Sequence, residues 1–184
     1  MYLVFKYHNS CLEVVWKAAR GCLEWAEARR YCGHVFAGLR HLHAHDVCHR
    51  DLCFANLLLS FRDNIVQIAD LGLAACAASF TLERNVAQLP ARVPEVLFSH
   101  RGGEDAVVLT HPQLSVDLWS SGTLVAALHV GRQLFEGHDE LTQLQAVLDF
   151  LGPPLDVWPG CADLHLWCEF EGSLTNRQPE MPPQ

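Results

Sequence analysis

The sequence predicts an α+β fold that is mainly helical and carries one small β-hairpin. Two observations support this fold class. Apolar residues recur at helical spacing in long segments, and short runs of β-forming residues occur at the start of the chain and on both sides of a turn. The expected helices span residues 27–45, 115–130 and 141–151, and the expected strands span 1–7, 57–59 and 65–68.

Each element has a local reason. Segment 1–7 is rich in aromatic and aliphatic residues that favour a strand. Arg62-Asp63-Asn64 supplies turn-forming residues between the two strands of the hairpin. The helix over 27–45 is expected to be amphipathic, because apolar residues fall on one of its faces. These residues are Tyr31, Val35, Leu39 and Leu42.

The two later helices differ in how their apolar residues are arranged. Helix 115–130 is apolar on most sides, which predicts a buried helix, and Gly131 is placed to end it. Helix 141–151 has one apolar face and is stopped by Gly152. Segment 73–91 shows little periodicity and is expected to be irregular.

Composition restricts the classes of function. The chain has 184 residues, of which 50% are hydrophobic, as in a globular domain. A formal charge of -8 and the absence of a basic run argue against nucleic-acid binding, and no apolar run is long enough to span a membrane. The eight cysteines form no CxxC pair and follow no signal peptide. We therefore expect an intracellular protein, cytoplasmic or nuclear, with reduced thiols.

The hairpin is expected to bring three oxygen-bearing side chains together. Asp51 and Asn56 precede its first strand, and Asp70 follows its second strand. Mg²⁺ prefers one or two carboxylates, a carbonyl and phosphate oxygens as ligands. A carboxylate that does not bind the metal can accept a proton from an attacking hydroxyl. These residue types in this order predict a phosphoryl-transfer site.

The motifs themselves resemble those of eukaryotic protein kinases. His49-Arg50-Asp51-Leu52-Cys53-Phe54-Ala55-Asn56 matches the catalytic-loop signature HRDLxxxN, and Asp70-Leu71-Gly72 stands where the family has DFG. The resemblance implies ATP and Mg²⁺ as cofactors, with Asn56 and Asp70 as metal ligands. It also implies Asp51 as the catalytic base, with His49 and Arg50 beside it.

Further segments resemble the cyclin-dependent branch of that family. They are Arg92-Val93-Pro94-Glu95, Asp117 to Gly122, Leu134-Phe135-Glu136-Gly137, Leu151-Gly152-Pro153-Pro154 and Trp158-Pro159-Gly160. In the family, the aspartate matched by Asp117 hydrogen-bonds the backbone of the catalytic loop. We expect residues 1–170 to form a partial kinase domain, and residues 171–184 a polar, proline-containing tail.

The same resemblance places the nucleotide. Segment 1–7 matches the last strand of the small lobe, so Phe5 stands at the gatekeeper position and the backbone of Lys6 and His8 is expected to face the adenine. Leu58 would form the apolar floor. No segment matches the Gly-rich loop, the strand lysine or the last large-lobe helices. The expected structure is therefore mainly the α-helical C-terminal lobe, with the N-lobe and terminal helices missing.

Three positions depart from the family pattern. Cys53 stands where serine/threonine kinases have a lysine that neutralises the transferred phosphate, and Gln88 stands where a threonine touches the catalytic aspartate. Glu83 falls at the place of the activation-loop phosphothreonine. It either pairs with Arg50 in place of a phosphate or is an exposed loop residue.

These observations leave three hypotheses open. The first is a protein serine/threonine kinase-like domain with a protein substrate and a cyclin-like partner, with weakened activity. The second is an inactive, pseudokinase-like module that binds a protein, and the third is a non-functional fragment. A zinc site is disfavoured although four histidines lie close in sequence, because they precede a kinase-like loop and form no defined zinc motif. They are His41, His43, His45 and His49.

Overall fold

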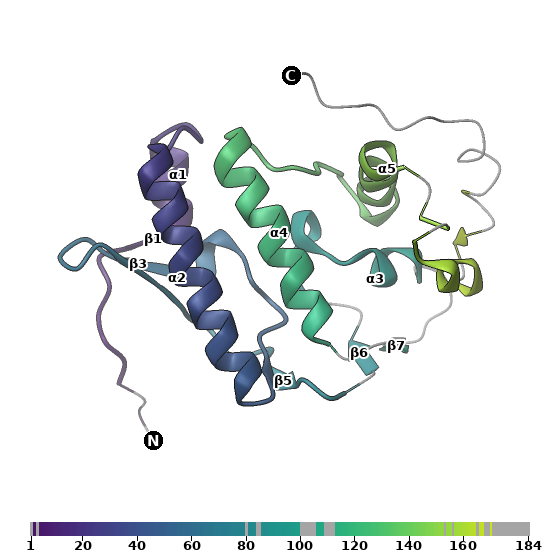
Figure 1. The fold of residues 1–184 in the computed structure, drawn as a ribbon, viewed down its shortest axis with the longest axis horizontal. Helices are drawn as coiled ribbons and strands as arrows, with labels where there is room; N and C mark the ends of the chain where they lie inside the picture. Colours follow the sequence, from purple (N-terminus) through teal and green to yellow (C-terminus); the bar gives the residue numbers. More distant parts are fainter. Residues whose placement is uncertain are drawn as a thin grey trace.

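The computed structural model describes residues 2, 4–79, 81–83, 86–99, 106–108, 113–152, 154–155, 157–164, 166–167 and 170. Its mixture of helices and small sheets is the α+β fold that the sequence predicts (Figure 1). The helices are α1 (Leu12–Ala18), α2 (Trp25–Ala44), α3 (Pro94–Phe98), α4 (Leu114–Val130) and α5 (Glu140–Leu151). The strands are β1 (Ser10–Cys11), β2 (Val47–Cys48), β3 (Leu57–Ser60), β4 (Ile65–Ile68), β5 (Ala75–Cys76), β6 (Thr81–Glu83) and β7 (Ala106–Val108).

The three long helices lie where the periodicity of the sequence predicts them. Helix α2 buries the predicted face at Tyr31, Val35 and Leu39. Helix α4 ends at Gly131, whose φ of 80° is a left-handed conformation that favours glycine. Helix α5 begins with a capping box, in which Asp139 accepts a hydrogen bond from the Thr142 backbone N–H at 2.8 Å.

The predicted hairpin is confirmed. Strands β3 and β4 pair antiparallel, with Leu57 opposite Ile68 and Ser60 opposite Ile65. Asn64 closes the turn in a left-handed conformation with φ 52°, which asparagine tolerates better than most residues. Strand β1 adds a third strand beside β3, so the sheet order is β1-β3-β4.

Two expectations about secondary structure were wrong. Residue 2 and residues 4–8 form no strand, and Val4, Phe5 and Tyr7 are largely exposed. Strand propensity reflects packing on a half-buried sheet, and no strand among the described residues pairs with this segment. Segment 73–91 is less irregular than expected, because β5 pairs with β2 and β6 pairs with β7.

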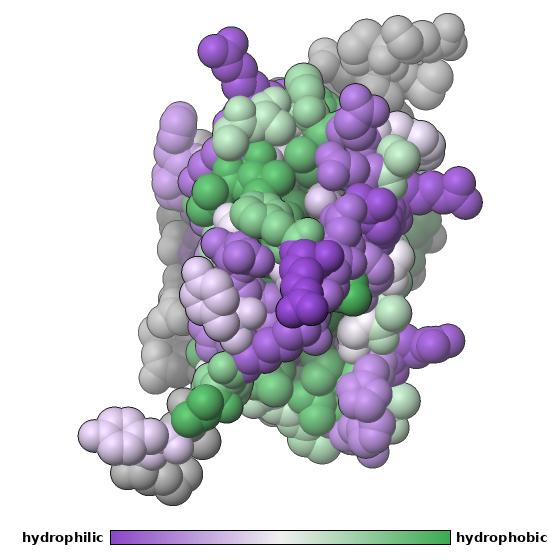
Figure 2. All heavy atoms as spheres, turned by 90° about the vertical axis from the view of Figure 1, so that its left-hand side faces the viewer, coloured by the Kyte–Doolittle hydropathy of each residue, from purple (hydrophilic) through white to green (hydrophobic). Residues whose placement is uncertain are grey.

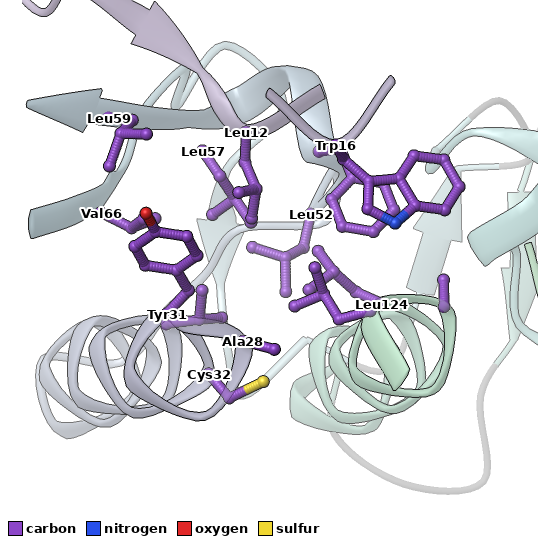
Figure 3. Close-up of a cluster of buried hydrophobic side chains, with 14 of the residues drawn as sticks. Leu12, Trp16, Ala28, Tyr31, Cys32, Leu52, Leu57, Leu59, Val66 and Leu124 are labelled. Atoms are coloured by element: carbon purple, nitrogen blue, oxygen red, sulfur yellow. The ribbon is translucent and has the colours of Figure 1, made fainter. Parts of the chain in front are cut away.

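The largest core lies between α2, α4 and the hairpin, with α1 on its edge (Figures 1 and 3). In Figure 3, Tyr31 of α2 points toward Val66 of the hairpin. Trp16 closes one end of this core by stacking on Phe54, with ring centroids 4.8 Å apart. A second core joins α3 and α5 through Leu97, Phe98, Leu144 and Leu148. No helix in the described part of the chain combines the length and apolar character that crossing a membrane requires.

Gly21 and Gly131 let the loop after α1 meet the end of α4. A Cβ on Gly21 would lie 1.8 Å from the Gly131 carbonyl oxygen, and Gly21 has a φ of 80°. We predict that Gly21→Ala lowers the free energy of unfolding by about 2 kcal/mol, measured in urea, because both strain and a backbone clash result. Gly33→Ala is the control, since nothing lies within 4 Å of its Cβ position. Equal stability of the two variants would contradict the prediction.

Candidate active site

The catalytic-loop residues Asp51 and Asn56 are joined directly. The loop runs from β2 into a 3₁₀ turn at Phe54–Asn56. The Asn56 side-chain Nδ2 donates hydrogen bonds to the Asp51 carboxylate and to the Asp51 carbonyl oxygen, both at 2.9 Å. The turn therefore holds one Asp51 oxygen in place and leaves the Asn56 Oδ1 atom available as an oxygen ligand for a metal ion.

The hairpin brings Asp70 to the same end of the sheet. The ladder ends at Leu57 and Ile68, and beyond it the Ala69 backbone N–H donates to the Asn56 carbonyl oxygen at 2.9 Å. Asp70 then turns into a left-handed conformation with φ 64°, and its carboxylate accepts a hydrogen bond from the Gly72 N–H at 3.1 Å. Such backbone strain on a non-glycine residue occurs preferentially at functional loops. The Asp70 side chain is exposed to solvent.

His49 links the catalytic loop to the residue before Asp70. Its side chain is fully buried, and Nε2 lies 2.9 Å from the Ala69 carbonyl oxygen. A carbonyl oxygen only accepts, so Nε2 carries the proton and Nδ1 is free to accept the Asp51 backbone N–H at 3.2 Å. Arg50 is 8% exposed and donates through Nε to the Leu73 carbonyl oxygen. Both side chains hold backbone segments of the site.

Asp117 of α4 fixes the backbone of the catalytic loop. Its buried carboxylate accepts hydrogen bonds from the His49 and Arg50 backbone N–H groups, each at 2.8 Å, as expected from the kinase pattern. His43 Nε2 lies 2.8 Å from the same carboxylate and is a third donor, which the sequence did not predict. The sequence places His43 in the last helical turn before the loop, and that position was its only signal.

The four residues predicted to contact the nucleotide line one hollow. Its volume is about 720 Å³, and Phe5, Lys6, His8 and Leu58 line it together with Asp70. Figure 2 shows that the side of the molecule carrying the hairpin and the N-terminal segment has apolar surface both above and below a band of polar side chains. The His8 ring donates from Nδ1 to the Lys6 carbonyl oxygen at 3.0 Å, so this carbonyl already has a donor within the chain.

The described residues contain no cluster of three or more histidine, cysteine, aspartate or glutamate side chains that suits a metal. Mg²⁺ does not need one, since it usually takes one or two carboxylates and completes its shell with water and phosphate oxygens. Asn56 and Asp70 fit that requirement, because they offer an amide oxygen and a carboxylate at the same end of the hairpin.

Two departures from the kinase pattern meet in space. The Gln88 side-chain Nε2 donates to the Cys53 sulfur at 3.3 Å, although the residues are 35 positions apart. Both line a small cavity of about 60 Å³ beside Trp16. Burial is the main cause that raises the pKa of the Cys53 thiol, so the residue is a neutral thiol at pH 7. Cys53 therefore supplies no positive charge at the position where the family has a lysine.

Three predictions from the sequence remain, which concern Leu71, Glu83 and the C-terminal tail. Leu71, at the place of the DFG phenylalanine, is 54% exposed and lies on the wall of the large hollow. Glu83 lies in β6, where its backbone pairs opposite Ala106. The side chain of Glu83 is outside the described part, and so is the proposed contact with Arg50. The proposed tail 171–184 also lies outside the described residues.

Comparison with known proteins agrees with these motifs. A family model described as protein kinase domain matches residues 1–158. A cell division control protein 2 homolog 3 of Trypanosoma brucei brucei is 32% identical over 169 residues, covering 89% of this chain and 51% of that protein. Cyclin-dependent kinase B2-2 of Arabidopsis thaliana is 33% identical over 179 residues, covering 92% of this chain and 53% of that protein. The chain spans about half the length of these curated relatives. It belongs to the protein kinase domain family, in the branch that resembles the cyclin-dependent kinases.

Proposed function

We propose that this chain forms the large-lobe part of an ATP-dependent protein serine/threonine kinase of the cyclin-dependent type. The observation that carries the proposal is the junction of the catalytic loop with the hairpin. There Asn56 holds Asp51, and the Asn56 carbonyl oxygen holds the residue before Asp70. In this proposal residues 1–170 are the partial kinase domain and 171–184 are a polar tail.

Each residue has a proposed role. Asn56 and Asp70 hold Mg²⁺, and bound Mg²⁺-ATP supplies the transferable phosphoryl group. Asp51 accepts the proton of the attacking hydroxyl, provided the hydroxyl lies within hydrogen-bond reach of its carboxylate. Leu58 and Phe5 cover the adenine within the large hollow, whose lining also includes Lys6 and His8. His49 and Arg50 are positioning residues, since they donate hydrogen bonds to the carbonyl oxygens of Ala69 and Leu73.

The proposed activity of the chain is weak. Stabilisation of the transferred phosphoryl charge dominates this chemistry, and Cys53 is a neutral thiol where the family has a cation. Removing one preorganised charge costs roughly 10² to 10³ in rate. The relatives named cyclin-dependent kinases suggest protein substrates and a cyclin-like partner for this chain.

An inactive module that binds a protein is the second candidate. It is favoured by the Gln88–Cys53 hydrogen bond, which joins the residues that replace the family's phosphate-neutralising lysine and the threonine that touches the catalytic aspartate. The apolar residues exposed on the chain could meet a partner, and Phe5 is 82% and Leu71 is 54% exposed. A chain with no stable fold is the third candidate.

A thermal melt with Mg²⁺-ATP distinguishes these candidates. At about ten times the dissociation constant, binding to the folded state raises the melting temperature by about 4 °C. Asp70→Asn is predicted to remove the Mg²⁺-dependent part of this shift, because one metal ligand loses its charge. Asp46→Asn is the matched control, since Asp46 is also exposed and also left-handed, with φ 57° against 64° for Asp70.

Each outcome of the melt has a distinct meaning. A shift that Asp70→Asn removes and Asp46→Asn preserves supports the nucleotide site. A cooperative melt without any shift contradicts it and favours the protein-binding module. A melt without cooperativity favours the fragment.

A further inference from the structure

His41 lies in the last turn of α2, His45 is the residue that caps the C-terminus of this helix, and their rings lie against each other. The ring centroids are 4.4 Å apart, and the ring planes are inclined by 44°. Both side chains are exposed. From this pair we propose a chelating site for a divalent transition-metal ion that prefers imidazole, with Zn²⁺ as its first candidate.

The hydrogen bond of His45 prepares it for this role. Its Nδ1 lies 2.8 Å from the His41 carbonyl oxygen, which can only accept, so Nδ1 carries the proton. The lone pair of His45 is therefore on Nε2. Metal-binding histidines usually donate their other ring nitrogen to a carbonyl or carboxylate in this way, which fixes both tautomer and ring orientation.

The spacing of the rings suits a shared ion. If the ion lies about 2.0 to 2.1 Å from each Nε2, and the two bonds are at the tetrahedral angle usual for Zn²⁺, the ring centroids are about 5.2 Å apart. The rings are 4.4 Å apart without the ion, so they must swing apart as it binds. The zinc-binding histidines of the HExxH motif have the same spacing of four residues, although there both lie within the helix.

His41 is free to take part. No hydrogen bond to its ring is recorded from the described residues, and the ring lines a hollow of about 380 Å³ between α2 and β4. Water would complete the shell of the ion, because no third histidine, cysteine or acidic side chain joins the pair within the described part. Two protein ligands predict a dissociation constant in the micromolar range.

The other two histidines of this segment are excluded by their contacts. His43 Nε2 bonds Asp117, and the two ring nitrogens of the buried His49 bond the Ala69 carbonyl oxygen and the Asp51 backbone N–H. The site is thus limited to the pair His41 and His45, and it is separate from the residues proposed to bind Mg²⁺-ATP.

The site is tested by titrating the full chain with Zn²⁺. Binding is measured by calorimetry and by nitrogen NMR of the histidine side chains. We expect one micromolar event in which the Nε2 signals of both histidines shift together. His41→Gln and His45→Gln should each weaken this event at least tenfold. His129→Gln is the control, because His129 is exposed and also bonds a carbonyl four residues back, that of Val125 at 2.7 Å, but has no histidine at that position.

Three results would overturn the proposal. One is a Zn²⁺ affinity that neither His41→Gln nor His45→Gln changes. Another is a loss in only one of them, which would mean that a single imidazole binds. The last is an equal loss in His129→Gln, which would mean that Zn²⁺ binds any exposed histidine. Thiol binding at exposed Cys22 or Cys76 would appear as a separate event that persists in all three variants.

Discussion

Replacing Asp117 by asparagine is expected to lower the free energy of unfolding by about 3 kcal/mol. The Asp117 carboxylate is completely buried and accepts three hydrogen bonds, from the backbone N–H groups of His49 and Arg50 and from His43 Nε2, each at 2.8 Å. An amide NH₂ group has no lone pair to offer, so at least one buried donor would lose its partner. Urea denaturation followed by circular dichroism measures the change.

Asp149→Asn is the control for this substitution. Asp149 is exposed on α5 and accepts a hydrogen bond from Gln145 four residues before it, at 2.7 Å. Its replacement should change the free energy of unfolding by less than about 0.5 kcal/mol. If Asp117→Asn were as stable as Asp149→Asn, the carboxylate would not be what holds the catalytic loop in place.

The sequence predicted those parts of the fold that depend on local order. Helices α2, α4 and α5 follow from apolar spacing, and the hairpin follows from the turn residues between two apolar runs. Residues 2 and 4–7, which were expected to lie in a strand, form none for the opposite reason. These residues favour a strand, but a strand also needs a neighbour to receive its hydrogen bonds, and composition cannot supply that information.

The candidate site also contains residues that the sequence motifs predicted and contacts that they did not predict. The motifs located Asp51, Asn56 and Asp70, and the hairpin explains why the chain brings them to one end of the sheet. The contact of His43 with Asp117 and that of Gln88 with Cys53 each join residues far apart in the sequence. Neither pair forms a recognisable motif, so only the folded chain shows them.

The Gln88–Cys53 contact leads to a prediction about catalysis. In the combined variant Cys53→Lys and Gln88→Thr, the rate of phosphoryl transfer should rise by roughly 10² over that of the unaltered chain, since a cation returns beside Asp51. Cys53→Lys alone should gain less, because Cys53 is only 8% exposed and Gln88 Nε2 would face the new ammonium group. Transfer of radiolabelled phosphate from ATP to a serine-containing peptide measures all three proteins.

Two further variants make the measurement decisive. Adding Asp51→Asn to the combined variant should abolish the gain, because the proposed base is lost while the cation remains. Adding Asp149→Asn should leave the gain intact, since Asp149 lies on the exposed surface of α5. If the combined variant transferred phosphate no faster than the unaltered chain, Cys53 and Gln88 would not be what limits the chemistry, and the inactive protein-binding module would become the better account of this site.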